Sequence, residues 1–117
     1  MERAIEDAKA NADLNGIDNA EFFAAGAEDI VPELINSGEK PDIVILDPPR
    51  AGSDERTLTA ICEAEPKKIV YVSCDAASLA RDLKFICANG YKIISSAACD
   101  MFPYTAHIET VVLLYHQ

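Results

Sequence analysis

Three side chains that could carry covalent or acid–base chemistry stand beside apolar runs in this sequence. Cys74 directly follows the run 68–73, and Asp47 directly follows the run 42–46. Glu109 opens the apolar run ETVVLL. Short apolar runs bounded by turn residues are typical of buried strands. Ligands of open α/β sheets bind beyond the carboxyl ends of the strands, so residues at these junctions are the first candidates for function.

Cys74 is a candidate nucleophile because a helix is predicted to begin almost immediately after it, at residue 76. The positive end of a helix dipole favours the thiolate, which is the nucleophilic form of cysteine. A lone cysteine is otherwise an ordinary small buried residue. This second interpretation suits Cys62, Cys87 and Cys99, which lie within helical or strand runs, whereas Cys74 lies at a junction.

The two carboxylates each have a functional and a structural interpretation. Asp47 opens DPPRAG, where two prolines make a rigid loop that could present the carboxylate and backbone carbonyls to a flat heteroaromatic substrate. An ordinary strand-to-helix turn explains this loop equally well. Glu109 lies among apolar residues, where an unpaired carboxylate is costly, so it is a candidate base. A solvent-facing edge position is the alternative for Glu109, and a surface position is the simpler explanation of the nearby His107.

The elements that must position these side chains alternate along the chain. The pattern predicts a mainly parallel α/β sheet covered by helices. The last two strands are joined by too short a segment for a crossover helix, so we expect them to form an antiparallel hairpin. Helices are predicted at 2–15, 27–37, 54–63 and 76–89, and strands at 20–25, 42–47, 68–73, 91–100 and 107–116.

Composition limits the class of protein. The 117 residues suffice for one domain, and no run of 18 apolar residues or signal peptide is present, so a cytoplasmic protein is expected. The 20 acidic residues outnumber the 10 basic ones, which argues against this segment binding a nucleic-acid backbone by itself. The four cysteines include no CxxC pair, so we predict neither a metal site nor a disulfide framework.

Taken together, the motifs LDPPRAG, VYVSCDAASLARDL and DMFPYTAHIETVVLL resemble the RNA uracil-5-methyltransferase family. Members of that family use S-adenosylmethionine to make 5-methyluridine in ribosomal and transfer RNA. The resemblance covers nearly the whole chain, and three motifs in the same order and at the same separations make it specific. It implies a Rossmann-like class I methyltransferase sheet, S-adenosylmethionine as the cofactor and RNA as the partner.

The resemblance also assigns roles to the candidate residues. Cys74 matches the cysteine of the family's SCNP motif and would add to C6 of uracil, so that C5 attacks the methyl group of the cofactor. Glu109 matches the glutamate after the family's FPxTxHvE motif and would remove the C5 proton. Asp47 matches the family's DPPR loop and would lie beside the methyl donor and the target base.

The sequence departs from the family pattern near this site. Asp75 and Ala76 replace the usual Asn-Pro after the cysteine, which we expect to remove a rigid turn and to place a charge that opposes the thiolate. Gly26 stands where the family commonly has a polar residue near the adenine of the cofactor, so no side-chain contact is expected there. Arg50 and Arg81 are candidate phosphate-binding or helix-anchoring cations.

A methyltransferase of this class also needs a Gly-rich loop and a ribose-binding acidic residue, and neither precedes the helix predicted at 2–15. We therefore expect residues 1–117 to be the C-terminal part of a larger catalytic domain. Such a part would lack the first two strands, the cofactor loop and the RNA-binding region, and would be inactive alone. The absent first strand would leave a gap between strands 20–25 and 42–47, which predicts a homodimer through exposed edges or a rearranged 20–25 segment.

Two other functions stay open at this point. The chain could be a non-catalytic interaction domain that merely retains Cys74 and Glu109. It could also be a methyltransferase with a DPP loop that acts on an exocyclic amine, a reaction that needs no cysteine.

Overall fold

The fold was analysed in a computed structural model, which describes residues 2–99 and 109–117. Every predicted helix is present, and the predicted strands other than 20–25 are present too, with described ends within two residues of the expectation. None of the helices in the described part of the chain is long and apolar enough to cross a membrane. The elements are α1 (Glu2–Leu14), α2 (Ala27–Asn36), β1 (Ile43–Leu46), α3 (Glu55–Ala64), β2 (Lys68–Ser73), α4 (Ala76–Ala88), β3 (Tyr91–Cys99) and β4 (Glu109–His116).

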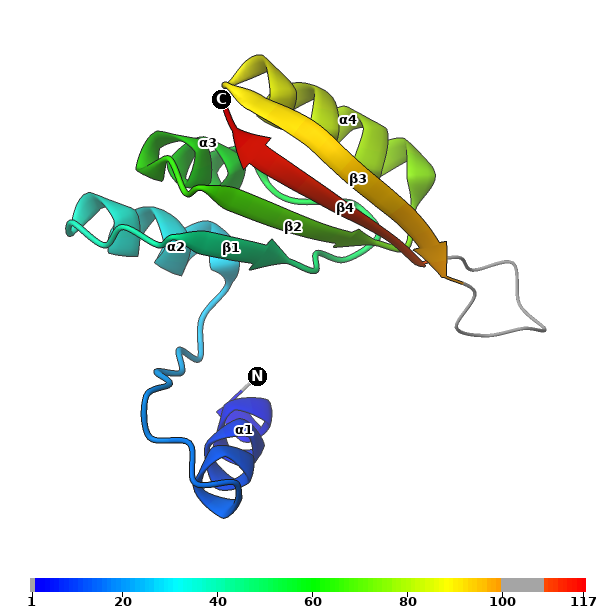
Figure 1. The fold of residues 1–117 in the computed structure, drawn as a ribbon. Coiled ribbons are helices and arrows are strands. Elements are labelled where there is room, and N and C mark those ends of the chain that lie inside the picture. Colours follow the sequence, from blue (N-terminus) through cyan, green and yellow to red (C-terminus); the bar gives the residue numbers. More distant parts are fainter. Residues whose placement is uncertain (1, 100–108) are drawn as a thin grey trace.

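The four strands form one mixed sheet in the order β1-β2-β4-β3 (Figure 1). β1 and β2 pair in parallel, and β4 runs antiparallel to both of its neighbours. β1, β2 and β3 therefore share one direction, and β4 lies against it between β2 and β3. The predicted α/β sheet with a final antiparallel hairpin is confirmed.

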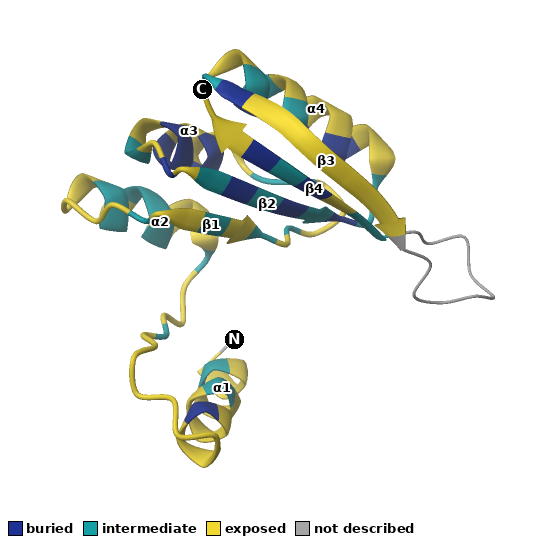
Figure 2. Cartoon of the chain, viewed as in Figure 1, coloured by how far each residue is buried: buried dark blue, intermediate teal, exposed yellow. Residues whose placement is uncertain are grey.

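Helices α2, α3 and α4 cover one face of this sheet (Figure 1). The core lies between that face and the helices, and β2 supplies it with alternate residues through Ile69, Tyr71 and Ser73. On the other face the isoleucines of β1 stay exposed, Ile43 by 53% and Ile45 by 71% (Figure 2). The buried cluster consists of Leu58, Ile61, Cys62, Ile69, Tyr71, Leu79, Ile86, Tyr91, Val112 and Leu114.

Capping residues fix where the two helices nearest the core begin. The Asp54 side chain accepts a hydrogen bond from the Arg56 N–H at the start of α3. The Asp75 side chain does the same for the Ser78 N–H at the start of α4. Such a cap contributes about 1 kcal/mol to helix stability by satisfying an N–H that has no partner within the helix.

The expectation of a strand at 20–25 is wrong. These residues form no strand, and Figure 1 shows them outside the sheet, as part of an extended connection between α1 and α2. Among the described strands β1 pairs only with β2, so it lies at an edge of the sheet. A strand needs a neighbouring strand for its backbone hydrogen bonds, and 20–25 has none here. The two outcomes predicted for the gap, a homodimer and a rearranged 20–25 segment, both stay predictions.

Candidate active site

The ends of three strands bring the candidate side chains to one edge of the sheet. The last registered pair of β1 and β2 is Leu46↔Tyr71, so Asp47 leaves the sheet beside the second half of β2. Cys74 follows the end of β2, and Glu109 is the first residue of β4. Strand spacings place the Asp47 backbone roughly 8 Å from that of Cys74. All three residues therefore adjoin strand ends at the same edge of the sheet.

Cys74 and Glu109 are related by the strand register itself. β2 and β4 pair from Lys68↔Tyr115 to Ser73↔Thr110, so Cys74 and Glu109 are the residues directly beyond the last pair of this ladder. A thiol and a carboxylate therefore flank the same end of the paired strands.

The turn that carries Cys74 is fixed by its two neighbours. The Ser73 hydroxyl donates to the Asp75 carbonyl at 2.9 Å and accepts from the Asp75 N–H at 3.1 Å. The Asp75 carboxylate caps α4 by accepting from the Ser78 N–H at 2.9 Å. These hydrogen bonds constrain the turn in the absence of the usual proline.

The capping geometry also determines the charge of Asp75. The backbone N–H of Ser78, and then its hydroxyl, lower the pKa of the Asp75 carboxyl below its ordinary value. Hydrogen bonds to a carboxylate favour its charged form. A negative charge therefore stands next to Cys74 at neutral pH, as the sequence indicated, but it is directed at the N-terminus of α4.

Side chains of α4 hold the loop that follows β1. The Ser78 hydroxyl donates to the Arg50 carbonyl at 2.6 Å, and Arg81 Nη2 donates to the Ala51 carbonyl at 2.5 Å. Asp82 Oδ2 accepts from the Ser53 N–H at 2.8 Å. Of the two roles suggested for Arg81, anchoring is the one its contacts support.

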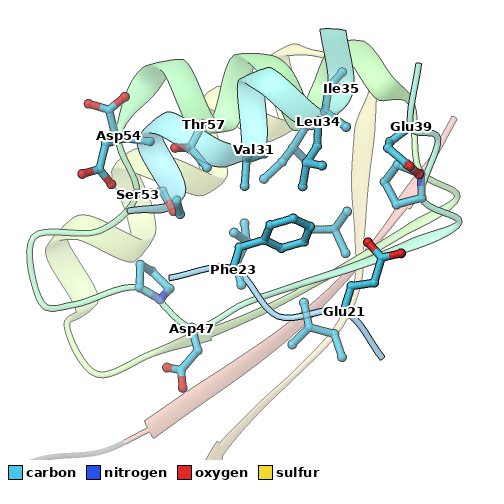
Figure 3. A pocket seen from close by; sticks show the side chains of 18 of the residues that line it. Glu21, Phe23, Val31, Leu34, Ile35, Glu39, Asp47, Ser53, Asp54 and Thr57 are labelled. Atoms are coloured by element: carbon cyan, nitrogen blue, oxygen red, sulfur yellow. The ribbon is translucent and has the colours of Figure 1, made fainter. Parts of the chain in front are cut away.

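A cavity of about 860 Å³ opens beside Asp47, between α2, α3 and β1. Figure 3 shows Phe23 in the middle of its apolar wall, with Val31 and Leu34 above it and Asp47 at the margin. Thr57 adds a polar group on the side of α3. An apolar wall with a few polar groups at the rim is the usual form of a site for a flat organic ligand.

Gly26 lies next to this cavity without lining it. It is the N-cap of α2, and its carbonyl accepts from the N–H groups of Asp29 and Ile30. The two residues after it, Ala27 and Glu28, line the cavity. Any contribution of this segment to ligand binding therefore comes from Ala27 and Glu28 and from the backbone, in keeping with the missing side chain at Gly26.

Two of the other cysteines are described well enough to compare with Cys74. Cys62 is buried in the core, and burial raises the pKa of its thiol to about 11, so it stays protonated at neutral pH. Cys87 is half-buried within α4. His107 and the side chain of Cys99 lie outside the described residues. The structural interpretation of Cys62 is supported.

Sequence reasoning missed several residues of this region. Phe23 was assigned to a strand, and nothing in its neighbourhood marked it as a cavity residue. Ser78, Arg81 and Asp82 were detectable as a group, because positions i, i+3 and i+4 share one helix face. Their target could not be inferred, since it is a loop about 30 residues away along the chain.

Comparison with known proteins shows the family of this chain. A family model described as tRNA (uracil-5-)-methyltransferase matches residues 2–117. The chain belongs to this family. Relatives at the sequence level include uncharacterized RNA methyltransferases of Clostridium acetobutylicum, 50% identical over 111 residues, and of Enterococcus faecalis, 46% identical over 114 residues. These matches cover 95% and 97% of this chain but only 24% and 25% of the relatives, so the chain spans about a quarter of their length.

Solved structures lead to the same family and fold. The crystal structure of Pyrococcus abyssi tRNA (uracil-54, C5)-methyltransferase, in complex with S-adenosyl-L-homocysteine, matches with a TM-score of 0.83 and 40% identity. The match covers 97% of this chain and 26% of the Pyrococcus abyssi chain. A precorrin-6y C5,15-methyltransferase of Geobacter metallireducens, at 17% identity and a TM-score of 0.57, shares the fold alone. The described residues of this uracil-5-methyltransferase family member thus adopt a fold found in methyltransferases.

Proposed function

We propose that the protein methylates C5 of uracil in RNA, with Cys74 as nucleophile and Glu109 as base. The observation that supports this most directly is the register of β2 and β4, whose last pair, Ser73↔Thr110, is directly followed by Cys74 on one strand and preceded by Glu109 on the other. A reaction at C5 needs both groups, because uracil C5 is a poor nucleophile until a thiolate has added to C6. Membership of the uracil-5-methyltransferase family supports the same assignment.

In the proposed reaction the Cys74 thiolate forms a bond to C6, and the electron pair of the C5–C6 double bond becomes available at C5. S-adenosylmethionine bound beside the base would supply the electrophilic methyl group to C5 and would leave as S-adenosylhomocysteine. Glu109 then accepts the C5 proton, the double bond reforms, and the C6–S bond breaks to release the Cys74 thiolate. The Asp47 loop lies beside this edge and would hold the base through its carboxylate and carbonyl groups.

The cavity beside Asp47 fits the cofactor in shape and charge. Phe23, Val31 and Leu34 offer an apolar wall for a flat ring, and the carboxylates of Asp47 and Glu21 lie on its lining. Carboxylates suit a ligand that carries a positive sulfonium and ammonium group. We infer that this cavity forms part of the S-adenosylmethionine site, and that the 117-residue chain alone is inactive because the rest of that site and the RNA-binding surface lie elsewhere.

The decisive experiment uses protein expressed from the natural start codon of its gene through Gln117. It is incubated with S-adenosylmethionine and RNA that contains 5-fluorouracil, and the product is analysed by mass spectrometry. Fluorine at C5 cannot be abstracted by Glu109, so we expect a covalent protein–RNA adduct that maps to Cys74 and is absent in Cys74→Ala. A protein that binds both ligands but forms no adduct would contradict the proposal and favour methylation of an exocyclic amine or a non-catalytic role.

Glu109→Gln provides the complementary test on ordinary RNA. The variant keeps the size of the side chain but cannot accept the C5 proton, so methylated RNA should stay attached to Cys74. The matched variant Glu63→Gln changes an exposed glutamate of α3 and should turn over normally. Normal turnover of Glu109→Gln would remove Glu109 from the role of base.

A further inference from the structure

The buried carboxylate of Asp82 has no part in the proposed reaction, yet it is saturated with hydrogen bonds. Its side chain is 2% exposed and accepts from the Tyr71 hydroxyl, from the Ser53 N–H at 2.8 Å and from Arg81 Nε at 3.1 Å. A buried carboxylate is costly unless donors of this kind surround it. One of the three donors is the backbone of the loop that follows β1, so Asp82 ties that loop to α4.

Two further side chains on the same face of α4 form hydrogen bonds with the preceding residues of the loop. Ser78 donates to the Arg50 carbonyl and Arg81 donates to the Ala51 carbonyl. The residues from 50 to 53 are thus bound by three side chains of one helix. We call Ser78, Arg81 and Asp82 the loop clamp.

The loop has a matching adaptation at Gly52. Its φ of +83° suits glycine, and a Cβ at this position would lie 2.5 Å from Arg81 Nη2 and 2.6 Å from Asp82 Oδ2. Only a residue without a side chain lets the backbone approach the clamp this closely. The close contact between loop and helix is therefore built into the sequence on both sides.

The same helix also holds the turn of Cys74. The Ser78 N–H bonds to the Asp75 carboxylate, while the Ser78 hydroxyl bonds to the Arg50 carbonyl. Ser78 thereby joins the residue after Cys74 to the loop that begins at Asp47. A rigid helix that contacts both segments fixes the distance between them.

We propose that the loop clamp sets the spacing between the Asp47 loop and Cys74, so that a base held by the loop lies within reach of the thiol. This inference rests on the proposed function. Ser78, Arg81 and Asp82 are positioning residues in this scheme, because they act through the loop and do not touch the base. Loosening the clamp should slow thiol addition and leave ligand affinity nearly unchanged, since small misplacements of reacting groups reduce rates steeply.

The main test is Arg81→Gln, because the Arg81 side chain is 60% exposed and its loss should not unfold the protein. Arg56→Gln is the matched control, since Arg56 is 66% exposed on α3 and loses the same charge without contacting the clamp. The protein expressed from its natural start codon is used. Hydrogen exchange of the loop amides is measured first, and the single-turnover rate of adduct formation with 5-fluorouracil RNA and the Kd for that RNA are measured next.

We expect Arg81→Gln to speed exchange of the 50–53 amides and to slow adduct formation about 10- to 100-fold, with a Kd within about threefold of the unaltered protein. Arg56→Gln should match the unaltered protein in all three. Restoration of the rate by Arg81→Lys, which keeps one donor, would support positioning further.

Three results would overturn the inference in distinguishable ways. Unchanged exchange in Arg81→Gln would mean that the clamp does not hold the loop. Faster exchange with an unchanged adduct rate would mean that the loop is held but that its position does not matter for the reaction. No adduct in the unaltered protein would instead remove the proposed function, and the positioning role would fall with it.

Discussion

The Tyr71 hydroxyl donates a hydrogen bond to the Asp82 carboxylate, and both side chains are buried. The bond joins the middle of β2 to α4, so it links the central strand to the clamp. Burial, and then the Asp82 carboxylate, raise the pKa of Tyr71 well above its ordinary value. Tyr71 therefore stays a protonated donor throughout the physiological range.

Tyr71→Phe should therefore lower the free energy of unfolding by about 1 to 3 kcal/mol, because Asp82 loses one of its donors in a buried setting. Tyr115→Phe is the matched control, since Tyr115 is 38% exposed on β4, and its effect should stay below about 0.5 kcal/mol. Urea denaturation followed by circular dichroism measures both. Equal effects of the two variants would show that the buried hydrogen bond contributes nothing to the free energy of unfolding.

Alkaline pH should destabilise the fold through two buried groups. Burial raises the pKa of Cys62 to about 11, and burial with the charges of Cys62 and Glu65 raises that of Tyr91 to about 12. Because these folded-state values exceed the ordinary ones, the stabilisation is complete below about pH 9 and is lost as pH rises through the folded-state values. Cys62 accounts for about 2 to 3 kcal/mol of this loss.

The measurement is the free energy of unfolding at pH 8, 9, 10 and 11 for the unaltered chain and for Cys62→Ala. The variant starts lower because it loses buried contacts, but it should lose less stability between pH 9 and 11. Parallel curves for the two proteins would contradict a buried, protonated Cys62.

Much of the fold could be predicted because its determinants are local. Apolar runs predicted β1, β2 and β4. The connection between the last two strands is too short for a crossover helix, which predicted the hairpin. Cys74 was placed correctly because a strand end and a helix start are both legible in SCDAAS. The strand predicted at 20–25 is absent for a non-local reason, since its apolar residues suit a strand only where a neighbouring strand is available.

The clamp could not be predicted for the same reason. The helical spacing of Ser78, Arg81 and Asp82 placed them on one face, but the sequence does not say that a loop passes over that face. Gly52 looked like an ordinary turn glycine until its contacts with α4 were known. Cys74 and Glu109 differ from these, because both adjoin strands that the sequence predicts, and the pairing of β2 with β4 brings those strand ends together.

Selective alkylation can test the environment of Cys74 without RNA. Cys74 stands at the N-terminus of α4, so it should react with iodoacetamide faster than half-buried Cys87, and buried Cys62 should react last. Peptide mapping by mass spectrometry gives each rate. Asp75→Asn removes the adjacent charge and keeps a capping side chain, so Cys74 should react a few times faster while Cys87, at the other end of α4, stays unchanged. A slower Cys74 in this variant would show that the carboxylate assists the thiol.

The 117-residue chain should self-associate through β1. This edge strand has unpaired backbone groups and the exposed Ile45, features that favour pairing with a second chain. Ile45→Lys should shift the chain toward monomer in light scattering, because a lysine on an edge strand disfavours pairing. Leu14→Lys is the control, since Leu14 is 84% exposed on α1, away from the sheet. A monomer at all concentrations would contradict the predicted homodimer.

Gly52→Ala should be more damaging than an alanine at another glycine of positive φ. Gly38 has a φ of +100°, and a methyl group added there would meet nothing within 4 Å, so Gly38→Ala causes only backbone strain of about 1 kcal/mol. At Gly52 the same strain adds to a contact of 2.5 Å with Arg81 and 2.6 Å with Asp82. We expect Gly52→Ala to lose at least about 1 kcal/mol more in urea denaturation and to speed exchange of the 50–53 amides. Equal losses of unfolding free energy in Gly52→Ala and Gly38→Ala would mean that Arg81 and Asp82 move aside at little cost. This result would contradict the proposal that they hold the loop in place.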